Sequence, residues 1–256
     1  MVLYVAYRTS RKLKDRSLIP PRLRSLGCTQ VHKSFWEVEE EKANIVLKIL
    51  HKNQPVLLRR IREIRKPRFV KEKGISEFGS LIIVTYGSPK EVKREKISNF
   101  LNKAPCIRLC RSVYAFCQEH SRFDESNELV DAQRFLKFIQ ELQSDVKVIP
   151  RVVVVNADSV EGLLEETRKC VEDEISDIVR YSKELYERVS KGEEDIQKIH
   201  CSLSKLKRRF IAVKKVASYY EKWLGINFTN SLVKTYATFR KIHLLVKEEQ
   251  KPQRSE

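Results

Sequence analysis

Several residue types are scarce in this chain, and each scarcity argues against a class of protein. The 256 residues include 7 glycines and 1 methionine, and no apolar run approaches the roughly eighteen residues that a membrane span requires. So few glycines leave little material for a phosphate-cradling loop. The sequence opens on strand-like residues, without a cationic leader and an apolar signal core. We therefore expect a soluble cytoplasmic protein with no membrane association.

The 6 cysteines and 5 histidines show no metal-ligand pattern. There is no Cys-x-x-Cys pair. Cys106 and Cys110 fall on one expected strand, about 13 Å apart by strand geometry, which is too far for a shared zinc ion. We expect buried free thiols, no metal site, no cofactor and no catalytic residue.

Positive charge is in excess and unevenly distributed. Lys and Arg number 51 against 34 Asp and Glu, a net charge of +17, which favours a polyanionic partner. Residues 1–79 carry 19 basic and 8 acidic side chains (+11), whereas residues 80–155 carry 12 and 9 (+3). Residues 156–200 have a net charge of −6 and residues 201–256 of +9, which predicts an acidic helix folded against a basic one.

The first half of the chain contains an internal repeat. Residues 81–117 match residues 2–38 at a spacing of 79, which becomes 78 after one deletion. Solenoid units are shorter and need three or more copies, so a unit of this length is a small domain used twice. The matches after the deletion include Arg16 with Arg94, Ile19 with Ile97, Leu23 with Leu101, Cys28 with Cys106, Val31 with Leu109, Lys33 with Arg111, Ser34 with Ser112 and Trp36 with Tyr114.

Each copy shows a strand, helix, strand, strand, helix, strand pattern, which is the ferredoxin-like βαββαβ arrangement. The expected fold class is α+β, with one unit at residues 1–66, a linker at 67–79 and a second unit at 80–155. Because two helices cover one face of a sheet only, we expect the two sheets to pack on each other as a pseudo-dimer within the chain. If the structure showed a single continuous sheet, or a second unit of different topology, the duplication hypothesis would fail.

Residues 156–256 change to long stretches of helical periodicity, interrupted at Gly192 and Gly225. They predict a helical hairpin or a three-helix bundle that mediates assembly or regulation, with a protein as a further partner.

The segment from Arg24 to Val38, in which a glycine-terminated helix leads into a strand pair, is similar to the ferredoxin-like small subunit of the CRISPR integrase. Cys106 to Phe116 fits the same shape. The resemblance covers roughly residues 1–155 as two copies and implies a fused version of the family's dimer. A fainter likeness, to chromate-resistance regulatory proteins, comes from the acidic residues 193–195 and the basic residues 205–210.

The resemblance does not extend to the family's nuclease chemistry. Members with nuclease activity carry an aspartate at the end of the first strand, where it can hold a divalent metal. This chain has Tyr7-Arg8 and Tyr86-Gly87 at those positions, with no carboxylate in either copy.

Three basic clusters can be assigned more than one role. The cluster between Arg8 and Arg24 is either a solvated loop or a set of phosphate contacts. The cluster at residues 59–68 is expected to protect a sheet edge, and the one at residues 205–215 to pair with the acidic helix. The residues expected to contact nucleic acid are Arg8, Arg11, Lys12, Lys14, Arg16, Arg22, Arg24, Lys33, Arg108 and Arg111.

These features predict a non-catalytic protein that binds DNA or RNA through phosphate contacts on the ferredoxin-like pair. Two alternatives remain open at this level. One is a metal-dependent nuclease of the same fold, and the other is a protein-interaction scaffold that binds no nucleic acid.

Overall fold

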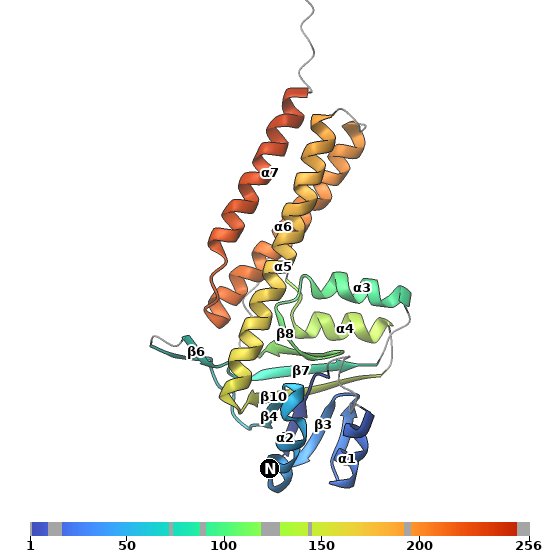
Figure 1. Ribbon diagram of the computed structural model, residues 1–256, viewed down its shortest axis with the longest axis vertical. Coiled ribbons are helices and arrows are strands. Elements are labelled where there is room, and N and C mark those ends of the chain that lie inside the picture. Colours follow the sequence, from blue (N-terminus) through green and yellow to red (C-terminus); the bar gives the residue numbers. More distant parts are fainter. Residues whose placement is uncertain are drawn as a thin grey trace, which may run out of the picture. The chain divides into compact units, whose positions relative to one another are not determined.

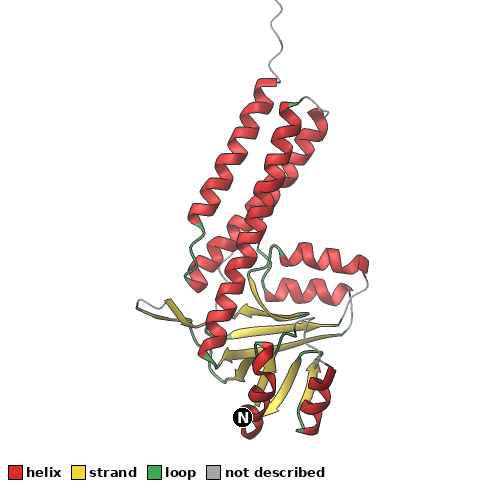
Figure 2. Cartoon of the chain, viewed as in Figure 1, coloured by secondary structure: helices red, strands yellow, loops and turns green. Residues whose placement is uncertain are grey.

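The structure is a computed structural model that describes residues 2–9, 17–71, 74–87, 91–118, 129–142, 145–191 and 196–249. The fold is α+β, with a large antiparallel sheet followed by a helical C-terminal region (Figures 1 and 2). The chain divides into two compact units. The sheet unit consists of Met1–Thr167 and Trp223–Gly225, and the helical unit of Arg168–Lys222 and Ile226–Glu256.

Two halves of the sheet unit have the same order of elements. The first half contains β1 (Val2–Ala6), α1 (Ile19–Ser25), β2 (Thr29–His32), β3 (Phe35–Glu39), α2 (Ala43–Leu50) and β4 (Val56–Arg60). The second half contains β7 (Leu81–Tyr86), α3 (Glu91–Leu101), β8 (Cys106–Cys110), β9 (Val113–Cys117), α4 (Ala132–Leu142) and β10 (Val146–Val154). The strands lie in the order β2-β3-β1-β4 in the first half and β8-β9-β7-β10 in the second.

The two halves are joined edge to edge in one eight-stranded sheet, so the expectation of two separate sheets is wrong. The outer strands β4 and β10 pair antiparallel, with Val152 opposite Arg60 and Val154 opposite Leu58. Each of these strands would otherwise present a row of unpaired N–H and C=O groups, and pairing them satisfies both rows. Strand β10 lies between β4 and β7, and Val152 is paired with both Arg60 and Leu81. Its pairing with β7 is irregular between Ile149 and Val152, where Arg151 has φ +57°.

Helices cover opposite sides of the strands in the two halves. Helices α1 and α2 lie on one side and α3 and α4 on the other, with the strands between them (Figure 1). The helix-facing core of the first half includes Val5, Leu23 and Trp36, and that of the second includes Val84 and Phe135. The strand faces turned away from these helices are buried as well, at Ala6, Phe35, Ile83 and Ala115. The unit is therefore layered, with helices outside and strands inside.

The segment expected to be a linker forms a hairpin of its own. Strands β5 (Arg68–Val70) and β6 (Gly74–Glu77) pair antiparallel in a separate two-stranded sheet. The base of the hairpin is tied to the sheet unit: Ser80 donates its backbone N–H to the Arg65 carbonyl at 2.8 Å. Trp223 donates its indole N–H to the Phe78 carbonyl at 3.0 Å, although the two residues lie far apart in the sequence.

The prediction of a helical C-terminal region is confirmed. It consists of α5 (Ala157–Ser190), α6 (Ile196–Leu224) and α7 (Thr229–Glu249). Within the helical unit, Leu185, Val189, Ile199 and Ile242 form a buried apolar cluster. Helix α6 ends where Gly225 takes φ +69°, a left-handed conformation that glycine adopts without steric cost. None of the described helices is long and apolar enough to cross a membrane.

Candidate nucleic-acid interface

The predicted contact residues lie at several places on the sheet unit. Arg11, Lys12, Lys14 and Arg16 are outside the described residues, so the structure does not place them. The exposed members are Arg22 and Arg24 in the last turn of α1, Lys33 in the turn between β2 and β3, Arg108 on β8 and Arg111 in the turn between β8 and β9. Arg24 also donates a hydrogen bond to Oε1 of Gln30 at 2.9 Å.

Arg8 is held within the fold. Its Nε donates a hydrogen bond to the Leu109 carbonyl at 2.7 Å, its Nη2 donates to the Arg108 carbonyl, and its Nη1 forms an ion pair with Glu166. Burial, together with the charge of Arg108, lowers the pKa of its guanidinium. The Arg8 side chain is 23% exposed. Arg8 therefore connects the end of β1 to β8, and its contact with nucleic acid stays a prediction.

A second cation makes the corresponding contact in the opposite direction. Nζ of Lys147, on β10, donates to the Val31 carbonyl on β2 at 3.4 Å. Val31 and Leu109, the two acceptors, are paired positions of the sequence repeat. The two acceptors occupy matched positions of the repeat, whereas the two donors do not, because Arg8 follows β1 and Lys147 lies on β10.

Backbone contacts at the ends of β1 and β7 also match. Tyr7 donates its backbone N–H to the Ser34 carbonyl at 3.0 Å, and Tyr86 donates to the Ser112 carbonyl at 3.2 Å. Both tyrosines are buried, and burial raises the pKa of each phenol above its ordinary value. A neutral, buried phenol is a poor ligand for a hard divalent cation.

Two described carboxylates lie close to these strand ends, and neither is grouped with further described metal ligands. Glu166 is paired with Arg8, and Oδ2 of Asp145 would lie 3.1 Å from a Cβ placed on Gly87. Across the described part of the chain, no three His, Cys, Asp or Glu side chains gather closely enough to hold a metal ion. Cys110, also near Arg8, is fully buried, and burial raises the pKa of its thiol to about 12.

His32 occupies the junction between the two halves. Its Nδ1 is buried and has no hydrogen-bond partner in the described parts of the chain. Burial lowers the pKa of the imidazole, whereas a hydrogen bond to the Tyr86 backbone and the charge of Asp145 oppose this shift, and the charges of Lys33 and Lys147 add to it. His32 is therefore neutral at pH 7.

The basic cluster that follows β4 has a different setting from the one expected. We predicted that it protects a sheet edge, but β10 already covers the edge of β4, so that interpretation is wrong. The cations continue instead along an exposed connection into β5. The exposed basic residues of this stretch are Arg60, Arg62, Arg65, Lys66, Arg68 and Lys71. Its exposed apolar residues are Ile64, Phe69 and Val70.

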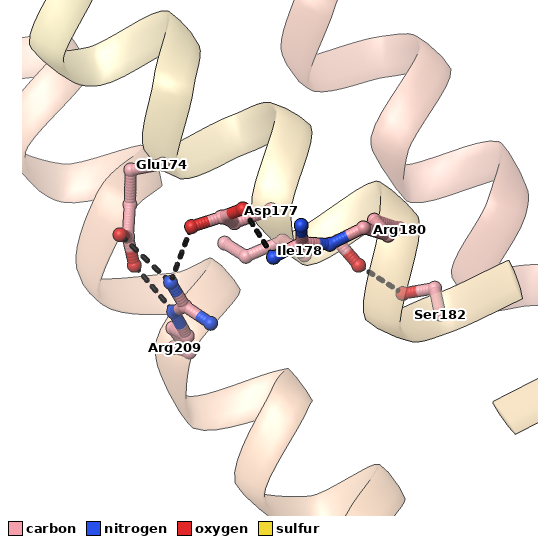
Figure 3. A network of polar contacts seen from close by, with 6 residues as sticks. All are labelled: Glu174, Asp177, Ile178, Arg180, Ser182 and Arg209. Carbon is pink, nitrogen blue, oxygen red and sulfur yellow. Dashed lines mark hydrogen bonds and ion pairs between the residues drawn. The ribbon is translucent and has the colours of Figure 1, made fainter. Parts of the chain in front are cut away.

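The structure places acidic and basic helices together in the helical unit, as the charge distribution predicted. Arg209 on α6 binds Glu174 on α5 through two hydrogen bonds, from Nε to Oε1 and from Nη2 to Oε2 at 2.8 Å, and its Nη2 lies 3.7 Å from Asp177 (Figure 3). The Glu174 hydrogen bond raises the pKa of the Arg209 guanidinium. Arg209, a member of the basic cluster at residues 205–215, therefore pairs with acidic residues of the same unit.

No family model, curated protein or solved structure matches this chain. The interpretation of the surface therefore depends on its charges and geometry alone.

Proposed function

We propose that this protein binds DNA or RNA without cleaving it. The observation that carries the proposal is the run of exposed cations on the sheet unit, from Arg60 to Lys71, where Glu63 is the one acidic residue in the described sequence. Closely spaced like charges repel one another and are stabilised when a polyanion approaches. A nucleic acid gains affinity at such a surface because its condensed counterions are released.

We further propose that the sheet unit is a duplicated pair of ferredoxin-like folds. The identical strand orders and the paired Tyr7 and Tyr86 backbone contacts both support a duplication. The single continuous sheet contradicts the expected packing of two separate sheets, which was the form in which the duplication was predicted. Edge pairing between two copies of one unit accounts for both the continuous sheet and the matched contacts. The sequence resemblance to the CRISPR integrase small subunit is consistent with such a fused dimer.

Binding without cleavage is supported by the chemistry at the ends of β1 and β7. A nuclease of the resembling kind would require a carboxylate there to hold its metal. Buried phenols occupy the strand ends, and Arg8 adds a positive charge that neutralises Glu166. The phosphate contacts then involve cations elsewhere on the unit, such as Arg22, Arg111 and the run ending at Lys71.

The proposal is tested by fluorescence anisotropy with labelled duplex and single-stranded DNA and RNA at several salt concentrations. We expect binding that weakens as a power of the salt concentration, with a log–log slope of about −0.9 per phosphate contact on duplex DNA. Incubation with magnesium or manganese should leave the labelled strands intact. Absence of binding to all four nucleic acids at 50 mM salt, at protein concentrations of tens of micromolar, would refute the proposal; chelator-sensitive cleavage would refute its non-catalytic part.

A further inference from the structure

The hairpin between the two halves has no counterpart in the repeat, and it concentrates exposed charge and exposed apolar surface. We call the described residues 65–71 and 74–79 the β5–β6 arm. Every residue of β5 is exposed, and the strand pairs with β6 alone, outside the eight-stranded sheet (Figure 1). Residues 65–71 include Arg65, Lys66, Arg68 and Lys71 and no acidic residue.

The arm is fixed at its base. Arg65 donates its backbone N–H to Oγ of Ser80 at 2.7 Å, and Ser80 returns a backbone hydrogen bond to the Arg65 carbonyl. The chain crosses itself so closely that a Cβ on Gly79 would lie 2.7 Å from the Arg65 carbonyl oxygen. Phe78 is buried against the ring of Trp223. A ribbon fixed in this way presents its cations without the entropic cost of ordering a free loop.

The arm exposes both charged and apolar side chains to solvent. Arg68 has one described ion-pair partner, Glu77, at 3.5 Å, and its side chain is 71% exposed. Phe69 is 51% exposed and Val70 42% exposed, so apolar surface is interleaved with the cations. Exposed apolar groups beside exposed positive charge fit a partner that offers both phosphates and base edges.

We infer that the β5–β6 arm is the element that enters the major groove of duplex DNA, with Arg65, Lys66, Arg68 and Lys71 against the phosphates and Val70 toward the base edges. The major groove of B-DNA, about 12 Å wide, admits a two-stranded antiparallel ribbon, whereas the deep, narrow major groove of duplex RNA does not. The inference rests on the proposed nucleic-acid binding and adds to it the contacting element, the groove and the preference for DNA.

The test compares two variants that remove the same charge. In the arm variant Arg65, Lys66, Arg68 and Lys71 are all changed to Gln; in the control, four exposed lysines on the helices and their ends, Lys48, Lys52, Lys96 and Lys137, are changed to Gln. For the arm variant we expect duplex DNA affinity to fall at least about tenfold at 100 mM salt and the log–log salt slope to flatten by roughly two to four. The control should retain most of its affinity, because its lysines lie outside the arm.

A second readout identifies the groove. Dimethyl sulfate methylates guanine N7, which faces the major groove, so the full-length protein should protect guanines in a bound duplex and the arm variant should not. Trp223 contacts the arm base, and an unchanged fluorescence unfolding transition will show that the arm variant is folded.

The outcomes separate the two proposals. If the unmodified protein binds no nucleic acid, the proposed function itself fails. If it binds but the arm variant binds equally well, or guanine N7 is not protected, the arm inference is wrong and the proposed function stands, with its contacts elsewhere on the sheet unit. Equal losses in the arm variant and the control would show a diffuse charge effect and would also overturn the inference.

Discussion

Replacing Arg8 by Met should destabilise the sheet unit selectively. The substitution keeps an unbranched side chain but removes the hydrogen bonds to the Leu109 and Arg108 carbonyls and the ion pair with Glu166. Hydrogen bonds from a charged donor contribute about 1.5–3 kcal/mol, and a partly exposed ion pair adds less than about 1 kcal/mol. The free energy of unfolding should therefore fall by about 2–4 kcal/mol.

Urea unfolding followed by tryptophan fluorescence measures this loss directly. The 2 tryptophans, Trp36 and Trp223, are both buried and both belong to the sheet unit, so their signal is specific to it. With a urea dependence of about 2 kcal/mol per molar, the Arg8→Met midpoint should fall by about 1–2 M.

The matched control is Lys147→Met, which removes the contact to Val31. That hydrogen bond is long, at 3.4 Å, and exposed, so the cost should stay below about 0.5 kcal/mol. An Arg8→Met midpoint within experimental error of the Lys147→Met midpoint would refute the idea that Arg8 fastens β1 to β8.

Three further outcomes are expected. His32→Asn should weaken the pH dependence of stability, because burial lowers the folded-state pKa of His32. In the unmodified protein the unfolded state takes up the proton first, so the free energy of unfolding falls as the pH drops below about 6.5. Urea midpoints at pH 7.5 and 5.5 measure this difference for both proteins. Arg209→Met should lower the free energy of unfolding of the helical unit by about 1 kcal/mol, because the paired hydrogen bonds from Arg209 to Glu174 are partly shielded from water. Unfolding followed by circular dichroism at 222 nm measures this loss. A loss no larger than that caused by substituting an exposed arginine would contradict the prediction. A thiol reagent should react readily with Cys170 and Cys201, both exposed, and slowly with the buried cysteines until urea is added; rapid modification of all 6 would contradict the structure.

The sequence predicted the strands and helices of the sheet unit well because their apolar periodicity is strong. Val5 and Val84, for example, face helices in corresponding places. It did not predict that β4 and β10 would pair. The period-two pattern of a strand determines which residues lie on each face of the sheet, but it does not determine which strand pairs with it. The arginines on β4 suggested a protected edge, and the partner strand lies about ninety residues further along the chain.

The candidate site was predictable in its charge but not in its geometry. Composition located the basic excess in residues 1–79, yet it could not distinguish Arg8, which donates to two backbone carbonyls, from Arg22, which is exposed. Those carbonyls come from β8, about a hundred residues away, and no local pattern reports that contact. The sequence predicted a linker at the β5–β6 arm because its strands are short. The signal that would have found the hairpin is Gly74, a turn-favouring residue between two small groups of strand-forming residues.

The contact between Trp223 and Phe78 has a consequence for how the protein is made. The two residues lie 145 positions apart, so a ribosome adding roughly 5–20 residues per second needs about 7–30 s to pass from one to the other. All the strands of the sheet unit have been synthesised well before that interval ends, but the indole that covers Phe78 has not. A nascent chain stalled before Trp223, or a fragment ending at Thr167, would carry the complete eight-stranded sheet with an aromatic residue uncovered at the base of its basic hairpin. The last turn of a helix made late in synthesis thus completes a core that was begun early.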